Sequence, residues 1–233
     1  MTGERFMATS VLGPGTIAVQ NFDQRVPRGA SPCYRRRVER PSEPVRPRTL
    51  VIAAVIFYGL MGGISVLLMP AFDLDPLAAV FGPSSAEATP GTLSHPLAAL
   101  IGAAAGMAVV GLSALLKRWG PMARLQDDFG QVLGDQTPGT IAVLAVASAV
   151  GEELLFRGLL MPLIGFWPTA IAFGVLHGGG VPRYFAWTLF ALLSGLLLAW
   201  LVHLTGSLLA PILCHLTINY WNLQALKPDT KAS

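Results

Sequence analysis

The chain has 233 residues, of which 53% are hydrophobic and 12% are charged, and its mean hydropathy is +0.57. Because soluble domains usually carry about 25% charged residues, this composition excludes an ordinary soluble protein. The net charge of +3 is unevenly spread. Residues 1–48 hold nine arginines and four acidic residues, a net charge of +5, whereas the rest of the chain holds seven basic and nine acidic residues, a net charge of −2.

Residues 1–48 are rich in Arg, Pro, Ser and Gly without sustained periodicity, which predicts a disordered basic tail. Such a tail can bind nucleic acid or anionic lipid, or it can mark the cytoplasmic side of a membrane protein. An apolar run begins at Leu50, so the last interpretation is sufficient and no nucleic-acid partner is expected. Two cysteines, Cys33 and Cys214, define no disulfide framework.

The apolar segments predict an all-α, polytopic transmembrane bundle of about six segments. Residues 50–72 contain no Asp, Glu, Lys or Arg, and 23 residues are enough to cross a bilayer core of about 30 Å. A second segment, 93–116, contains glycines at 102 and 106, a spacing that suits close helix packing. We divide the chain into the tail (1–48), two accessory transmembrane helices with a polar connection (49–137) and a core of further apolar segments (138–226).

The distribution of basic residues predicts the orientation of these segments. Basic residues in the tail, in the 117–136 connection, at Arg183 and near the C-terminus would lie on one side of the membrane. By the positive-inside rule both termini are then cytoplasmic, and the cell (plasma or inner) membrane is the expected location. The segment 168–180 is short for a full crossing and could be re-entrant or tilted.

Three charged residues lie within six positions of an otherwise apolar segment, in the run Gly151-Glu-Glu-Leu-Leu-Phe-Arg-Gly158. A charge at mid-membrane costs about 2.5–3.5 kcal/mol on insertion scales, so such residues are usually functional. Glu153 and Arg157 have the i, i+4 spacing of an ion pair. Glu152 lies about 100° around the helix and remains free to point into the bundle. The alternative is a purely structural ion-pair cluster or an interfacial helix.

Two further polar clusters follow on later segments. His177 ends the run Phe173-Gly-Val-Leu-His, and a lone histidine in a helix is more often a packing or hydrogen-bonding residue than a catalyst. His215 and Asn219 have i, i+4 spacing, so both side chains can reach one point, although such pairs also hold helices together in membranes. The positions of Glu152 and His215 within their segments, roughly 20 Å and 14 Å from the segment ends, allow them to meet in the bilayer core.

The ordered motifs E-E-x-x-x-R, F-x-x-x-H and H-x-x-x-N resemble the CPBP family, which contains the CAAX prenyl endopeptidases and the Abi-type proteins linked to bacteriocin self-immunity. The resemblance covers about residues 138–224 and includes the approach to the last motif at 205–215. It implies an intramembrane glutamic endopeptidase without a cofactor, acting on a membrane-associated peptide or protein.

The resemblance also implies roles for single residues. Glu152 and His177 would activate a water molecule, and His215 and Asn219 would stabilise the oxyanion. The supporting residues would be Glu153 and Arg157.

Other mechanisms and functions remain open from the sequence. A Glu/His/His set could bind zinc, although no H-E-x-x-H element is present. A thiol mechanism is disfavoured, because Cys214 and His215 are adjacent on a helix and do not face each other. A non-catalytic immunity or assembly factor of the same fold and a proton pathway are the rival functions. The substrate could be of CAAX type, or a bacterial peptide or sorting signal.

Overall fold

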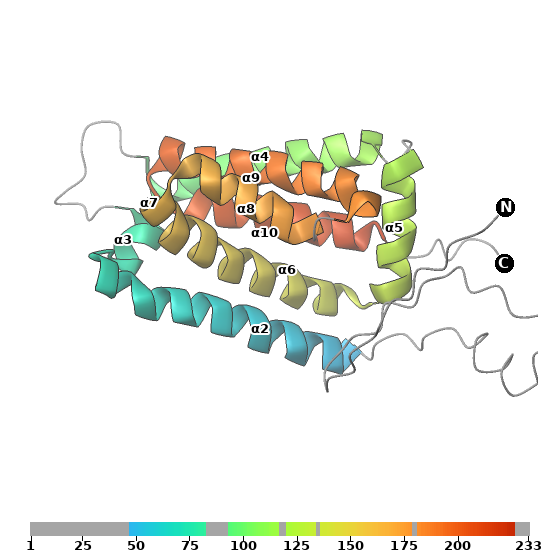
Figure 1. The fold of residues 1–233 in the computed structure, drawn as a ribbon, viewed down its shortest axis with the longest axis horizontal. Coiled ribbons are helices and arrows are strands. Elements are labelled where there is room, and N and C mark those ends of the chain that lie inside the picture. The colour runs from blue at the N-terminus through green and yellow to red at the C-terminus, as the bar shows by residue number, and fades with distance from the viewer. Residues whose placement is uncertain (1–46, 83–92, 117–119, 134–135, 179–180, 227–233) are drawn as a thin grey trace, which may run out of the picture. The chain divides into compact units, whose positions relative to one another are not determined.

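The computed structural model describes residues 47–82, 93–116, 120–133, 136–178 and 181–226. The chain divides into two units, Met1–Glu43 and Pro44–Ser233, and the second unit holds all of the described residues. Residues 1–46 of the predicted basic tail, including Cys33, lie outside them, as do Lys117, Arg118 and the terminal lysines, whereas Pro47 and Arg48 begin α2. In the described part of the chain every regular element is a helix, which confirms the all-α prediction (Figure 1).

The main helices are α2 to α10, joined by short 3₁₀ and π segments. Their bounds are α2 Pro47–Leu68, η1 Met69–Phe72, α3 Pro76–Phe81, α4 His95–Leu116, α5 Gly120–Leu133, α6 Pro138–Glu153, η2 Leu154–Leu160, α7 Met161–Ile164, α8 Phe166–Gly178, η3 Pro182–Tyr184, α9 Phe185–Thr205 and α10 Leu209–Gln224.

Four helical stretches of the described chain are long and apolar enough to cross a membrane, at Arg48–Phe72, His95–Leu116, Pro138–Ile164 and Pro182–Thr205. Large apolar side chains on these stretches face outward, as expected in contact with lipid. The chain is therefore a multi-helix membrane protein. α8 has 13 residues and α10 has 16, and at 1.5 Å per residue they extend about 20 and 24 Å. A total of six crossings stays a prediction.

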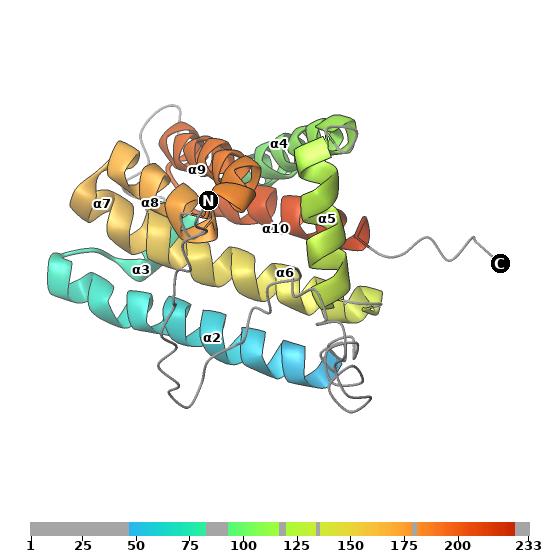
Figure 2. The same cartoon turned by 45° about the vertical axis from the view of Figure 1, so that its right-hand side comes forward.

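The short helix α10 is the centre of the bundle. It packs against α4, α6 and α9, while α2 packs along α6 and α8 packs along α9 (Figures 1 and 2). The glycines of α4 make the α4–α10 contact possible. A Cβ atom on Gly102 would overlap the Ala210 carbonyl, and one on Gly106 would lie 2.7 Å from the Cys214 carbonyl oxygen. The predicted close packing at this glycine pair is confirmed.

A second close contact joins α2 to α6 next to the charged motif. A Cβ atom on Gly151 would lie 2.6 Å from the carbonyl oxygen of Tyr58, and one on Gly62 would lie 3.3 Å from the Cα atom of Gly151. Because neither glycine carries a side chain, the two backbones can approach each other. This contact places α2 beside Glu152, although α2 belongs to the segment that we predicted to be accessory.

Two local features differ from the sequence analysis. The connection 117–136 contains an amphipathic helix, α5, which lies across one end of the bundle (Figures 1 and 2). It forms because apolar residues recur at helical intervals within a polar stretch. The charged motif is not a regular α-helix throughout, because Leu154–Leu160 is a π-helix. Such wider turns are frequent at functional sites.

Candidate active site

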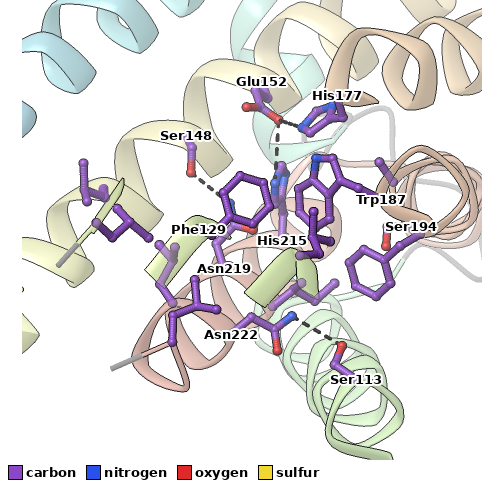
Figure 3. A pocket seen from close by; sticks show the side chains of 18 of the residues that line it. Ser113, Phe129, Ser148, Glu152, His177, Trp187, Ser194, His215, Asn219 and Asn222 are labelled. Atoms are coloured by element: carbon purple, nitrogen blue, oxygen red, sulfur yellow. Dashed lines mark hydrogen bonds and ion pairs between the residues drawn. The ribbon is translucent and has the colours of Figure 1, made fainter. Parts of the chain in front are cut away.

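A cavity of about 370 Å³ lies within the bundle and is lined by residues of α2, α4, α5, α6, α8, α9 and α10. The four residues predicted to be catalytic all line it, although they come from three different helices. Figure 3 shows Glu152 from α6 facing His177 from α8 and His215 from α10, with Asn219 further along α10. The structure therefore brings together the side chains that the sequence analysis grouped by motif.

The Glu152 carboxylate lies between two imidazole rings. Its Oε2 atom is 3.5 Å from Nε2 of His177 and 3.7 Å from Nε2 of His215. The residue is 7% exposed, and Oε2 has no hydrogen-bond partner among the described residues. Both separations exceed the 2.7–3.2 Å of an ordinary hydrogen bond. A buried carboxylate oxygen thus faces two ring nitrogens without bonding directly to either.

The hydrogen bonds made by the Nδ1 atoms of His177 and His215 indicate which ring nitrogen carries hydrogen. Nδ1 of His177 donates to the carbonyl oxygen of Phe173 at 2.8 Å, and Nδ1 of His215 donates to Oε1 of Glu153 at 2.8 Å. In a neutral imidazole only one nitrogen carries hydrogen, so the Nε2 atom of a neutral ring presents a lone pair to the cavity, whereas that of a protonated ring donates. With both rings neutral, Glu152 Oε2 and the two Nε2 atoms are three acceptors that face one another, an arrangement that suits a molecule able to donate O–H or N–H groups.

Glu153 is fully buried and binds two cationic or polar partners through one oxygen. Its Oε1 atom accepts a hydrogen bond from Arg157 Nη1 at 2.9 Å as well as the one from His215. Arg157 Nη2 donates to the carbonyl oxygen of Gly195 on α9 at 3.0 Å, and its guanidinium lies 4.4 Å from the ring centroid of Phe173. The predicted i, i+4 ion pair is present, and it also orients the His215 ring.

Asn219 lies one helical turn from His215 and contacts α6 at a residue that the sequence analysis did not single out. Its Nδ2 atom donates to Ser148 Oγ at 2.9 Å, and Ser148 precedes Glu152 by one turn. Ser148 in turn donates to the carbonyl oxygen of Ala145 at 3.2 Å. The antiparallel helices thus pair Glu152 with His215 and Ser148 with Asn219. The i, i+4 spacing of Ser148 and Glu152 was the available sequence signal.

The rest of the cavity wall is mainly apolar, and part of it comes from α5. Phe129 of α5 packs edge-on against Trp187 of α9, with ring centroids 5.4 Å apart. Outside the cavity, Arg183 binds Asp128 of α5 through both carboxylate oxygens at 2.7 Å. The spacing of apolar residues in α5 would have predicted this wall; those lining the cavity are Met122, Leu125, Phe129 and Leu133.

Other candidate residues lie elsewhere. Cys214 is buried and does not line the cavity. His95 and His203 are exposed near helix ends. Within the part of the chain that the structure describes, no group of three or more His, Cys, Asp and Glu side chains is arranged to hold a metal ion.

Comparisons with known proteins agree with the motif resemblance. Residues 135–221 match the family model described as type II CAAX prenyl endopeptidase Rce1-like, and this range includes all six predicted site residues. The uncharacterized protein YpbD of Bacillus subtilis (strain 168) is 32% identical over 108 residues, which cover 44% of this chain and 54% of the relative. The chain thus spans about half the length of that relative. No solved structure matches the chain.

Proposed function

We propose that the chain is an intramembrane endopeptidase that uses a glutamate-activated water, because residues 135–221 match the family model described as type II CAAX prenyl endopeptidase Rce1-like. The observation that carries the proposal is the Glu152 carboxylate oxygen held 3.5 and 3.7 Å from two imidazole nitrogens inside a cavity. An isolated carboxylate inside a membrane protein is energetically unfavourable, so a buried glutamate held beside two imidazole rings is expected to have a function.

In the first step, Glu152 accepts a proton from water while the water oxygen attacks the carbonyl carbon of the scissile peptide bond. His177 holds the second hydrogen of the water through its Nε2 lone pair, because its Nδ1–H is committed to Phe173. The carbonyl π electrons move to oxygen, which becomes the oxyanion of a tetrahedral intermediate. In the second step, protonated Glu152 returns its proton to the leaving nitrogen as the C–N bond breaks, giving a carboxylic acid and an amine. Transfer of the acid's proton to the amine then yields a carboxylate and an ammonium group.

Oxyanion stabilisation falls to His215 and Asn219. His215 donates from Nε2 only as an imidazolium, and the Glu153 carboxylate orients its ring through Nδ1. Asn219 uses one Nδ2 hydrogen on Ser148 and keeps the other for the oxyanion. Removing one such donor typically reduces the rate about 10²–10³-fold.

The proposed substrate is a membrane-associated peptide or protein with an uncharged stretch at the cleavage site. A largely apolar cavity favours such a stretch over a charged one, since a charge there would lose its hydration. CAAX-type processing and the processing of a bacterial peptide or sorting signal are both consistent with this chemistry. Comparing the termini of membrane proteins from cells with the wild-type chain and with Glu152→Gln would identify the substrate.

The decisive variant is Glu152→Gln, which keeps the side-chain volume and removes the proton acceptor. We expect cleavage to be abolished while membrane insertion and thermal stability are retained. His203→Ala, which changes an exposed histidine outside the cavity, is the control and should cleave normally. Full cleavage by Glu152→Gln would refute the mechanism. A biological effect that persists without cleavage would instead favour a non-catalytic factor.

A further inference from the structure

The cavity contains a second polar pair that the proposed reaction does not use. Asn222 of α10 and Ser113 of α4 both line the cavity, and Asn222 Nδ2 donates to Ser113 Oγ at 3.4 Å. Ser113 donates to the carbonyl oxygen of Val109 at 2.9 Å, so its oxygen is an acceptor toward Asn222. Both residues lie outside the three motifs and outside the family match, which covers residues 135–221.

The pair resembles the contact between Asn219 and Ser148. In both cases a carboxamide on α10 donates to a serine of a neighbouring helix, and in both cases the serine hydroxyl is committed to its own helix. Figure 3 shows Asn219 between Glu152 and Asn222. The two carboxamides therefore form a polar strip that leads away from the proposed reaction centre along the cavity wall. Phe129 and Trp187 add aromatic surface to the cavity wall.

We infer that Asn222 and Ser113 form a subsite that binds an uncharged backbone peptide group of the substrate, beside the peptide group that is cleaved. The inference rests on the proposed function. Asn222 keeps a second N–H and a carbonyl oxygen beyond its bond to Ser113, so it can both donate to and accept from a peptide group.

The spacing of the two carboxamides suits an extended peptide. Three helical residues separate Asn219 from Asn222, which is about 4.5 Å along the axis, and an extended chain advances about 3.3 Å per residue. A peptide whose cleaved carbonyl faces Asn219 therefore presents another backbone group to Asn222 one or two residues away. An alkyl chain in that place would leave the carboxamide without a partner, which is unfavourable.

The test measures binding without cleavage, in the full chain carrying Glu152→Gln. The probes are a fluorescein-labelled peptide of Ala, Leu, Val and Ser and analogues in which one backbone amide at a time is replaced by an ester. One ester position should weaken binding about five- to tenfold, the value expected for one hydrogen bond. Asn222→Leu should weaken binding of the all-amide peptide by a similar factor. This variant should bind the ester analogue that weakened binding to Asn222 no more weakly than it binds the all-amide peptide.

Two further variants separate binding from folding. Ser113→Ala, a smaller change, should weaken binding about twofold by freeing the Asn222 carboxamide. Thr217→Val changes a hydroxyl of α10 that bonds to Leu213 and does not line the cavity, so it should leave the affinity unchanged.

Three results would overturn the inference: unchanged affinity of Asn222→Leu, equal ester effects with and without Asn222, or no binding of the peptide at all. A loss of thermal stability in Asn222→Leu without a change in affinity would assign the pair to helix packing alone. The binding assay uses the Glu152→Gln chain, so its result does not depend on the proposed chemistry. The cleavage assay, with Glu152 intact, tests that chemistry separately.

Discussion

The buried pair Glu153–Arg157 offers a test in which stability and activity should separate. Both side chains are completely buried, and the carboxylate oxygen bonded to Arg157 also bonds to His215. Arg157→Met leaves the Glu153 carboxylate without its cationic partner, and breaking a buried ion pair typically costs about 3–5 kcal/mol. For a chain of this size that corresponds to a fall in Tm of about 6–20 °C.

The double variant Glu153→Gln/Arg157→Met removes both charges and should recover most of that stability, since a buried pair replaced by neutral groups of similar volume is often close to neutral. Its activity should nevertheless stay low. His215 keeps a neutral partner for Nδ1 but loses the charge-assisted hydrogen bond to the carboxylate that orients its ring, and we expect a decrease of about 10²-fold in kcat.

The assay combines thermal unfolding of the detergent-solubilised chain with cleavage of a substrate found by the terminus comparison. Wild type, the two single variants and the double variant form one thermodynamic cycle. Two outcomes would contradict the reasoning. A double variant as unstable as Arg157→Met would show that the charges are not coupled, and a double variant with wild-type kcat would show that His215 does not depend on Glu153.

Three other predictions follow from the packing and the site. Gly102→Leu should prevent the α4–α10 contact and strongly lower the yield of folded protein, whereas Gly111→Leu, on an open face of α4, should be tolerated. Size-exclusion chromatography measures the two yields, and equal yields would contradict this prediction. Ser148→Ala should lower kcat about five- to thirtyfold with little change in KM, because Asn219 loses its acceptor, and Ser148→Thr should restore it. No further loss from Ser148→Ala in an Asn219→Ala background would confirm that Ser148 acts through Asn219. Cleavage should survive exhaustive chelation, because the proposed mechanism uses a carboxylate and no metal; loss of activity that zinc restores would favour the zinc mechanism.

Much of the candidate site could be predicted from the sequence because the membrane makes polar residues conspicuous. In a chain with 12% charged residues, Glu152, Glu153 and Arg157 stand out in an apolar segment, and each must have a partner. Helical periodicity then predicted the Glu153–Arg157 contact, which the structure confirms at 2.9 Å. It also predicted that His215 and Asn219 share one face. Composition was equally sufficient for the all-α membrane fold.

Contacts between helices required the tertiary structure. Periodicity says which residues share a face but not which helix that face meets, so the bonds from His215 to Glu153 and from Asn219 to Ser148, across 62 and 71 residues, could not be derived. The same limit applied to the imidazole protons, because the bond at Nδ1 decides what Nε2 offers to the cavity. Helix α5 was overlooked because its charges concealed its apolar face, and only its position across the bundle end made it a wall of the cavity.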